Sequence, residues 1–120
     1  MAKVMVVEDS TLMIAVIKNF IQKMEKDIEV IEAHSGEESI EKYNSERPDL
    51  VFMDIKMPGM DGITALEKIM EADDKAKVVM CTSLKEPEQE EKAKKAGCAG
   101  YIMKPFSKKD ITDAVEEYIG

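Results

Sequence analysis

The chain has 120 residues, of which 44% are hydrophobic and 35% charged, and a net charge of -8. This length suits one domain, residues 1–120, and the negative charge argues against a nucleic-acid partner, because phosphate binding needs a basic surface. Two cysteines and one histidine argue against a disulfide scaffold and a zinc site, and without a signal peptide or an apolar run of roughly 20 residues we expect a cytoplasmic protein that makes no membrane contact.

Five short apolar runs recur along the chain, and each has the length of a strand. They are residues 4–7, 30–31, 50–53, 78–81 and 101–103. Several runs are continuous rather than alternating, which is typical of strands that are buried on both faces of a parallel sheet.

Helical patterns fill the intervals between the first four runs. Ser10 is a suitable N-cap for a first helix, whose apolar residues recur at helical spacing from Met13 onwards. Ser35 begins a second helix, and Glu38, three residues later, predicts a capping box. Asp61 is a suitable N-cap for the third helix.

Two more helices follow towards the end of the chain. Pro87 stands where a fourth helix would begin, and Gly97 stands where it would end. This segment has only two alanines as clear apolar residues, so we expect the helix to pack weakly and to move easily. Ser107 and Asp110 open a fifth helix. The alternation βαβαβαβαβα predicts an α/β fold.

Polar residues stand where the predicted strands end. Glu8 and Asp9 follow the first strand, Asp54 the third, Thr82 the fourth and Lys104 the fifth. In a doubly wound parallel sheet with right-handed crossovers and the common strand order 2-1-3-4-5, these ends meet where ligands bind. Three carboxylates repel one another there, so we expect the lysine and a hard cation such as Mg2+ to compensate their charge.

A carboxylate, a cation, a hydroxyl and an ammonium group together suit phosphoryl transfer. The carboxylate can act as the nucleophile and form an acyl phosphate, while the positive groups neutralise the phosphoryl oxygens. The chain lacks a G-x-x-x-x-G-K-[ST] loop, so it is not expected to bind a nucleotide in the P-loop manner.

Four sequence blocks at these strand ends resemble the receiver domains of bacterial and archaeal response regulators. The blocks are VVEDS at 6–10, FMDIKMPGMDG at 52–62, CTS at 81–83 and GYIMKPF at 100–106. The resemblance covers essentially the whole chain. It implies a flavodoxin-like (βα)5 sandwich with a five-stranded parallel sheet in the order 2-1-3-4-5. It also implies a phosphorylatable switch rather than an enzyme, with only self-phosphorylation and self-dephosphorylation.

The resemblance implies roles around the cation. Asp54 resembles the phosphoacceptor, and the cation, Mg2+ or Mn2+ as its substitute, would be held by Asp9, Asp54, the backbone carbonyl of Lys56 and, through water, Glu8. Lys104 resembles the lysine that pairs with the phosphoryl group, and family members usually have a cis bond before the proline that follows it.

The resemblance also implies how the signal leaves the site. A sensor histidine kinase or a phosphotransfer protein would donate the phosphoryl group, Thr82 would follow it, and Tyr101 would swing into the space vacated. The face formed by the fourth helix, the fifth strand and the fifth helix would then change shape for a downstream target protein. Chemotaxis is one output of such proteins, and a monomer or a weak dimer is expected.

Some residues depart from the family pattern. Glu8 stands where Asp is commoner, and Lys56 and Leu84 flank the path of the attacking water, so the phosphoryl lifetime is not implied. Chemotaxis members often carry Arg after the methionine of the first helix, where this chain has Ile14.

Three other interpretations stay open to different degrees. A phosphatase of the haloacid dehalogenase type would need a second Asp where Lys56 stands, and a cap domain for which the chain has no room. A scaffold that works without phosphorylation would usually lack one of the acids. A receiver that is part of a longer transcriptional regulator would look the same, although the initial Met and the end after the fifth helix favour a stand-alone protein. The cognate kinase and the target are not indicated.

Overall fold

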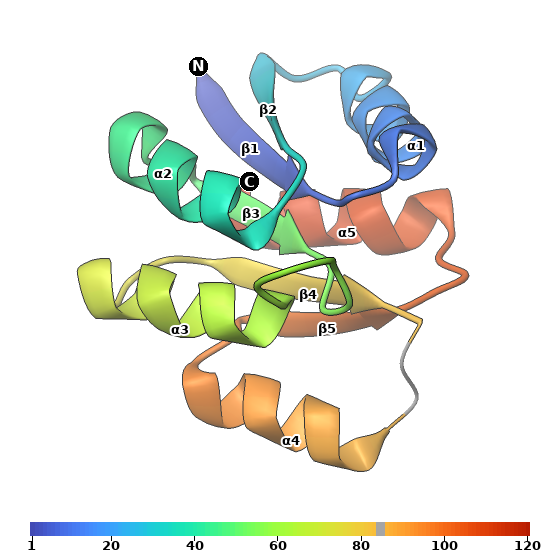
Figure 1. Ribbon diagram of the computed structural model, residues 1–120. Coiled ribbons are helices and arrows are strands. Elements are labelled where there is room, and N and C mark those ends of the chain that lie inside the picture. Colours follow the sequence, from blue (N-terminus) through green and yellow to red (C-terminus); the bar gives the residue numbers. More distant parts are fainter. Residues whose placement is uncertain (84–85) are drawn as a thin grey trace.

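The computed structural model describes residues 1–83 and 86–120 of the chain, and strands and helices alternate along it (Figure 1). The strands are β1 (Ala2–Val7), β2 (Ile28–Ala33), β3 (Leu50–Met53), β4 (Val78–Thr82) and β5 (Gly100–Met103). The helices are α1 (Thr11–Gln22), α2 (Gly36–Glu46), α3 (Gly62–Ala72), α4 (Pro87–Ala96) and α5 (Lys108–Ile119). The predicted order of elements is confirmed.

The strands form one parallel sheet in the order β2-β1-β3-β4-β5, as predicted. Strand β1 lies between β2 and β3, so the chain first winds outwards on one side of β1 and then returns to the other side. The strand order therefore reverses beside β1, and the carboxyl ends of β1 and β3 lie next to each other at that point.

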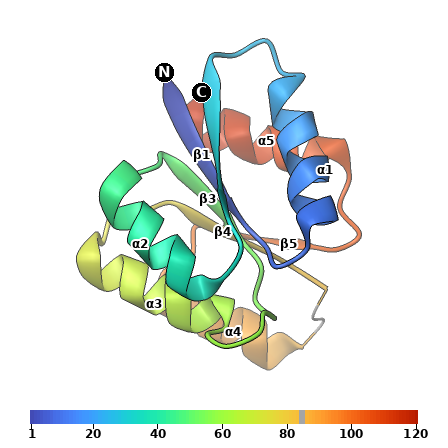
Figure 2. The same ribbon diagram turned by 45° about the horizontal axis from the view of Figure 1, so that its top comes forward.

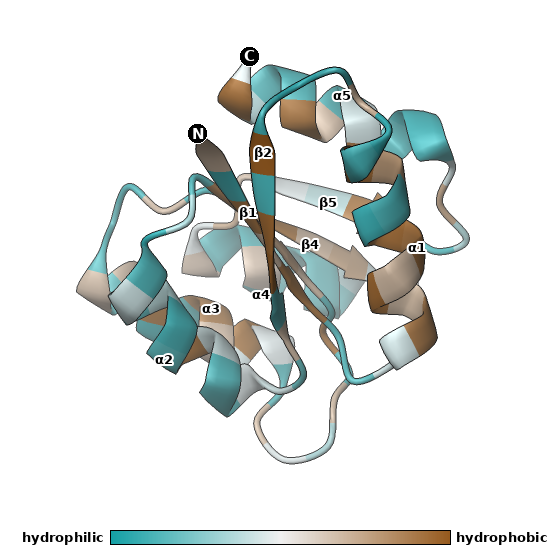
Figure 3. Cartoon of the chain, turned by 90° about the horizontal axis from the view of Figure 1, so that it is seen from above, coloured by the Kyte–Doolittle hydropathy of each residue, from teal (hydrophilic) through white to brown (hydrophobic). Residues whose placement is uncertain are grey.

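Helices cover both faces of the sheet, with α1 and α5 on one side and α2, α3 and α4 on the other (Figure 2). Successive residues of a strand face opposite sides, so Val4 and Val6 pack towards α1 and α5, whereas Met5 and Val7 pack towards the other helices. In Figure 3 the inner strand β4 is therefore largely brown, whereas the edge strand β2 has teal bands and α2 on the outside is largely teal.

Several predicted strand boundaries are wrong. Strands β1 and β5 begin earlier than expected, at Ala2 and Gly100, and two further differences share one physical reason. Strand β2 extends over Ile28–Ala33, not only over 30–31, because it pairs with β1 along its whole length. Thr82 is the last residue of β4 rather than the first residue after it, because it pairs with Met103 of β5. Hydrogen-bond pairing defines the end of a strand, whereas the prediction followed apolar character.

The predicted N-caps lie where the sequence places them. The side chains of Ser10, Ser35 and Asp61 accept hydrogen bonds from the first turns of α1, α2 and α3, and Ser107 with Asp110 forms a reciprocal capping box on α5. At α2 the expected box is wrong, because the Glu38 carboxylate accepts a hydrogen bond from the backbone N–H of His34 at 2.5 Å.

Helix α4 is attached to the core mainly through Ala93, the residue of this helix that is buried. It begins at Pro87 and ends at Gly97, which adopts a left-handed conformation with φ 100°. Ion pairs join Glu90 to Lys94 and Glu91 to Lys95 along its own surface. With one buried residue, the helix has few apolar contacts with the core, as the sequence predicted, and its ease of movement stays a prediction. Within the described ranges no helix has the length and apolar character of a membrane span.

Candidate functional site

The sheet itself positions the acidic residues that follow β1 and β3. The backbone N–H of Glu8 donates to the carbonyl of Ala33 at 3.0 Å, which continues the pairing of β1 with β2 by one residue. In the same way, the backbone N–H of Asp54 donates to the carbonyl of Val7 at 3.1 Å. Both side chains consequently project from a rigid edge of the sheet rather than from a free loop.

Three carboxylates meet at this edge of the sheet. Glu8, Asp9 and Asp54 each offer one oxygen, and these oxygens lie within 4.8 Å of one another. Glu8 and Asp54 are 2% and 7% exposed, whereas Asp9 is exposed to solvent. The arrangement is therefore open on the side of Asp9 and enclosed on the side of Glu8.

Lys104 brings a positive charge to the same edge from β5. Its backbone N–H donates to the carbonyl of Thr82 at 2.8 Å, and its peptide bond to Pro105 is cis, as the resemblance implied. The ammonium nitrogen Nζ lies 2.6 Å from Oε2 of Glu8 and 3.7 Å from Oδ2 of Asp54. In this structure the lysine therefore bonds most closely to Glu8.

Negative charge outweighs positive charge in the cluster. Burial raises the pKa of Glu8 above its usual range although Lys104 opposes the shift, and burial likewise raises the pKa of Asp54 against the same lysine. Burial alone would lower the pKa of Lys104, but Glu8 and Asp54 outweigh it and raise that pKa. One lysine therefore does not compensate these carboxylates fully, which suits an additional cation.

The other predicted site residues lie on β4, on β5 and in the segment after β3. Thr82 is fully buried at the end of β4, and Lys56 has an exposed side chain in the segment that leads from β3 to α3. Tyr101 is half-buried on β5, where it packs against the core on the α4 side of the sheet. Leu84 lies outside the described residues. The roles of these residues stay predictions.

Gly62 is a structural requirement of the site that the sequence reasoning missed. Its backbone N–H donates to the carbonyl of Ile55 at 2.7 Å, so α3 begins directly against the chain that follows Asp54. A Cβ atom on Gly62 would lie 1.9 Å from the carbonyl oxygen of Asp54. A glycine directly after the N-cap Asp61 was the available signal, because it permits such a close backbone approach.

Replacing Gly62 with Ala is expected to destabilise the protein by about 3 kcal/mol, the upper part of the range for an overpacked interior. The methyl group would collide with backbone, which cannot turn aside as a side chain can. Urea unfolding measures the change. Gly100→Ala is the control, because the nearest atom to its added methyl group lies at 3.5 Å. Equal, small losses for both variants would contradict the close packing at Asp54.

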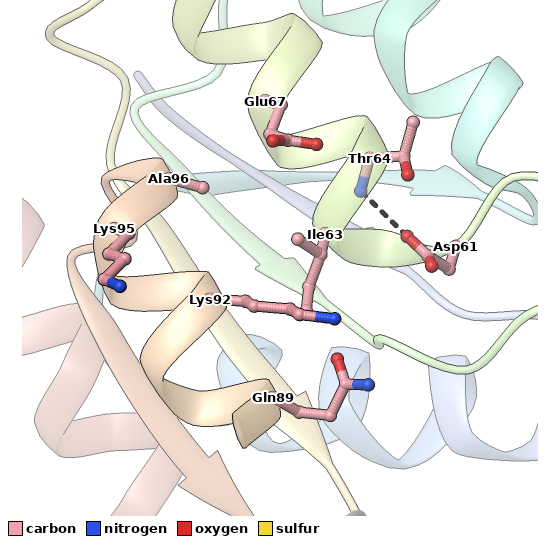
Figure 4. A pocket seen from close by; sticks show the side chains of 8 residues that line it. All are labelled: Asp61, Ile63, Thr64, Glu67, Gln89, Lys92, Lys95 and Ala96. Carbon is pink, nitrogen blue, oxygen red and sulfur yellow. Dashed lines mark hydrogen bonds between the residues drawn. The ribbon is translucent and has the colours of Figure 1, made fainter. Parts of the chain in front are cut away.

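A groove of about 430 Å³ runs between α3 and α4, and its lining does not include the residues of the carboxylate cluster (Figure 4). The start of α3 and its N-cap form one wall, and α4 forms the other. The lining residues are Asp61, Ile63, Thr64 and Glu67 on the first wall and Gln89, Lys92, Lys95 and Ala96 on the second. The groove shows that α4 leaves open space against its neighbour.

The sequence is similar to the receiver domain of response regulators and to several chemotaxis proteins. The profile of the response regulator receiver domain matches residues 4–116. The chemotaxis protein CheY of Halobacterium salinarum is 43% identical over 99% of this chain and 98% of its own length. CheY of Listeria monocytogenes is 39% identical, and 98% of each chain is covered.

Solved structures agree with the sequence relatives. A CheY-like receiver domain protein from Methanospirillum hungatei superposes with a TM-score of 0.91 at 28% identity, covering 98% of this chain and 92% of its own. A chain of the CheX–CheY–BeF3–Mg2+ complex from Borrelia burgdorferi gives a TM-score of 0.90 at 30% identity, covering 99% and 90%. With five parallel strands in the order 2-1-3-4-5 and a receiver profile over nearly its whole length, this chain belongs to the receiver domains of response regulators.

Proposed function

We propose that this protein is a phosphorylation-activated switch of chemotaxis that accepts a phosphoryl group on Asp54. The observation that carries the proposal is the position of Asp54 at the strand-order reversal, among two further carboxylates and Lys104. The donor would be a sensor histidine kinase or a phosphotransfer protein in the cytoplasm. Full-length similarity to CheY proteins supports chemotaxis as the output. Residues 1–120 would act as one domain, with no reaction beyond gain and loss of its own phosphoryl group.

The donor atoms of the site fit Mg2+, with Mn2+ as a substitute. Carboxylate oxygens from Glu8, Asp9 and Asp54 are hard ligands, and Mg2+ is typically held by one or two carboxylates together with waters and a phosphate. The backbone carbonyl of Lys56 would add one more oxygen. When bound, the ion would neutralise charge on the phosphoryl oxygens. The BeF3 and Mg2+ named for the Borrelia complex support the same ion here.

The chemical step would be an in-line displacement at phosphorus. A carboxylate oxygen of Asp54 attacks, the O–P bond of an acyl phosphate forms, and the P–N bond to the donor's histidine breaks; the histidine keeps the electron pair of that bond and takes up a proton. Lys104, at 3.7 Å from Asp54, helps to keep this buried carboxylate ionised and can then pair with the phosphoryl oxygens. The hydroxyl of Thr82 would bond to another of these oxygens.

The output would be a changed surface on α4, β5 and α5. Thr82 and Tyr101 lie on the two neighbouring strands β4 and β5, so a shift of Thr82 towards the phosphoryl group would alter the packing around Tyr101. Helix α4 packs against this tyrosine's side of the core chiefly through Ala93, and can therefore shift with little loss of contact. A downstream target that prefers one arrangement would report the phosphorylation state.

Intact mass spectrometry after incubation with acetyl phosphate tests the proposal. The wild type is expected to gain the mass of one phosphoryl group with Mg2+ and none with a chelator, and Asp54→Asn is expected to gain none. Asp61→Asn is the matched control, because it removes a nearby charge while keeping a good N-cap on α3. An unmodified wild type with Mg2+ present would instead favour a scaffold that works without phosphorylation.

A further inference from the structure

The ion pair between Lys104 and Glu8 differs from the surface ion pairs of this protein. Its two side chains are 17% and 3% exposed, and Nζ lies 2.6 Å from Oε2. The pair between Lys109 and Asp113 has the same 2.6 Å separation, but those side chains are 80% and 60% exposed. Water can replace either partner of the exposed pair, whereas it has little access to Glu8.

The enclosure of Glu8 restricts what Lys104 can do. If the ammonium group moved fully to a phosphoryl group on Asp54, the Glu8 carboxylate would be left buried and uncompensated, which is strongly unfavourable. A cation at the carboxylate cluster would remove this obstacle, since the same carboxylate belongs to the cluster. The lysine and the cation therefore have a common partner.

We propose that Glu8 is a positioning residue that holds Lys104 away from Asp54 until a divalent cation replaces the lysine at the Glu8 carboxylate. Lys104 and the cation compete for the Glu8 carboxylate, so loading of the cation releases the lysine towards the phosphoryl group. This inference rests on the proposed function, because it concerns the same Asp54 site. A glutamate at this position, where aspartate is commoner, has the longer side chain that reaches Lys104.

The length of the Glu8 side chain makes the contact with Lys104. Shortening it by one methylene withdraws the carboxylate by about 1.5 Å, the length of one carbon–carbon bond. Glu8→Asp therefore keeps the charge but loosens the 2.6 Å contact. If competition occurs, this change relieves it. If Glu8 only binds the cation, the change merely alters a ligand.

Calorimetric titration with MgCl2 of the wild type, Glu8→Asp, Lys104→Met and the double variant separates these two cases. With competition, Lys104→Met tightens Mg2+ binding, and the effect of Glu8→Asp differs between the two backgrounds by about five-fold or more, as for coupled neighbours. Lys109→Met removes the same charge from an exposed pair and is expected to change the affinity by less than about two-fold, because solvent and salt screen it. Equal effects of Glu8→Asp in both backgrounds would overturn the inference.

NMR of lysine side chains labelled with 15N gives a second readout, which does not require Lys104→Met to fold. The Lys104 ammonium signal of the wild type is expected to shift when MgCl2 is added, and in Glu8→Asp it is expected to lie near the shifted position before any addition. A Lys104 signal that is insensitive to both changes would refute the competition, as would a wild type that binds no Mg2+.

Mg2+ binding and phosphorylation of this protein can be measured independently of each other. Both readouts need only MgCl2, whereas phosphorylation is measured by intact mass. If the effects of Glu8→Asp and Lys104→Met on Mg2+ affinity are additive and the wild type gains a phosphoryl group, the competition is refuted and the proposed function stands. If the two effects on Mg2+ affinity are coupled and the wild type is never phosphorylated, the competition is supported and the phosphorylation switch is refuted.

Discussion

Lys104→Met is expected to lower the free energy of unfolding of the metal-free protein by about 3 kcal/mol at neutral pH, as for one partner removed from a buried ion pair. The variant leaves the Glu8 carboxylate, 2% exposed, near two other carboxylates without its ammonium partner. Methionine retains much of the apolar stem of lysine, so the loss reports charge rather than packing. Urea unfolding in the presence of a chelator measures it.

The loss should depend on pH with a definite sign. Burial raises the pKa of Glu8 in the folded protein, and Lys104 is what opposes this shift. Without the lysine the folded pKa rises further above its unfolded value, so folding favours the protonated carboxyl. The destabilisation is therefore smallest at acid pH, below the usual value of 4.5, and grows as the pH rises through the folded pKa.

Lys109→Met is the matched control for the stability measurement. It removes the same charge from an ion pair of the same 2.6 Å separation on the exposed surface of α5. Its expected cost is below about 1 kcal/mol. A Lys104→Met variant as stable as this control at every pH would contradict the interpretation of Glu8 as a buried charge that needs its partner.

Asp54→Asn is expected to stabilise the metal-free protein and to abolish most of its stabilisation by Mg2+. Burial raises the pKa of Asp54, which means that folding works against its charged form, and a neutral amide of the same shape removes this cost. For the wild type, Mg2+ at a hundred times its dissociation constant adds about 2.7 kcal/mol. The variant lacks one of the three carboxylates and should gain much less.

The order of the unfolding temperatures of the wild type and Asp54→Asn is therefore expected to reverse when MgCl2 replaces the chelator. In chelator Asp54→Asn unfolds at a higher temperature than the wild type, and in MgCl2 it unfolds at a lower one. Asp74→Asn, in an exposed turn after α3, changes the net charge equally and should leave both temperatures nearly unaltered. A wild type that MgCl2 fails to stabilise would contradict the assignment of a cation to this cluster.

Both predictions express one property of the site, which is that the protein folds around charges it does not fully compensate. Such destabilised groups gather where a protein binds ions or performs chemistry. Here hydrogen bonds to Ala33 and Val7 hold the backbones of Glu8 and Asp54 in place, which limits how far the two carboxylates can move apart. The two carboxyl groups whose pKa burial raises are therefore the ones that the proposed function assigns to a cation and a phosphoryl group.

The sequence by itself determined the order of the elements and the residue types that meet at the site. Strands buried on both faces need continuous apolar runs, and helix starts need side chains such as Ser10 and Asp61 that accept backbone hydrogen bonds, so both are visible in a local pattern. The carboxylates at the ends of β1 and β3 followed from the same pattern, because parallel strands bring their carboxyl ends to one edge.

Pairing between distant segments was decided only by the tertiary structure. Thr82 belongs to β4 because β5 pairs with it, and the hydroxyl of Tyr43 donates to Asp73 at 2.8 Å because α2 and α3 lie side by side. No local pattern encodes such contacts, since each joins residues that are about 20 or more positions apart in the sequence.

The same reason explains what the sequence left open at the site. It predicted that Lys104 would lie near the carboxylates, but the choice of Glu8 at 2.6 Å over Asp54 at 3.7 Å depends on ångström differences in reach between strands. Gly62 likewise reads as an ordinary helix start until α3 is placed against the carbonyl of Asp54. The sequence therefore determined which charged groups meet at the site, and three-dimensional packing decided which of them contact one another.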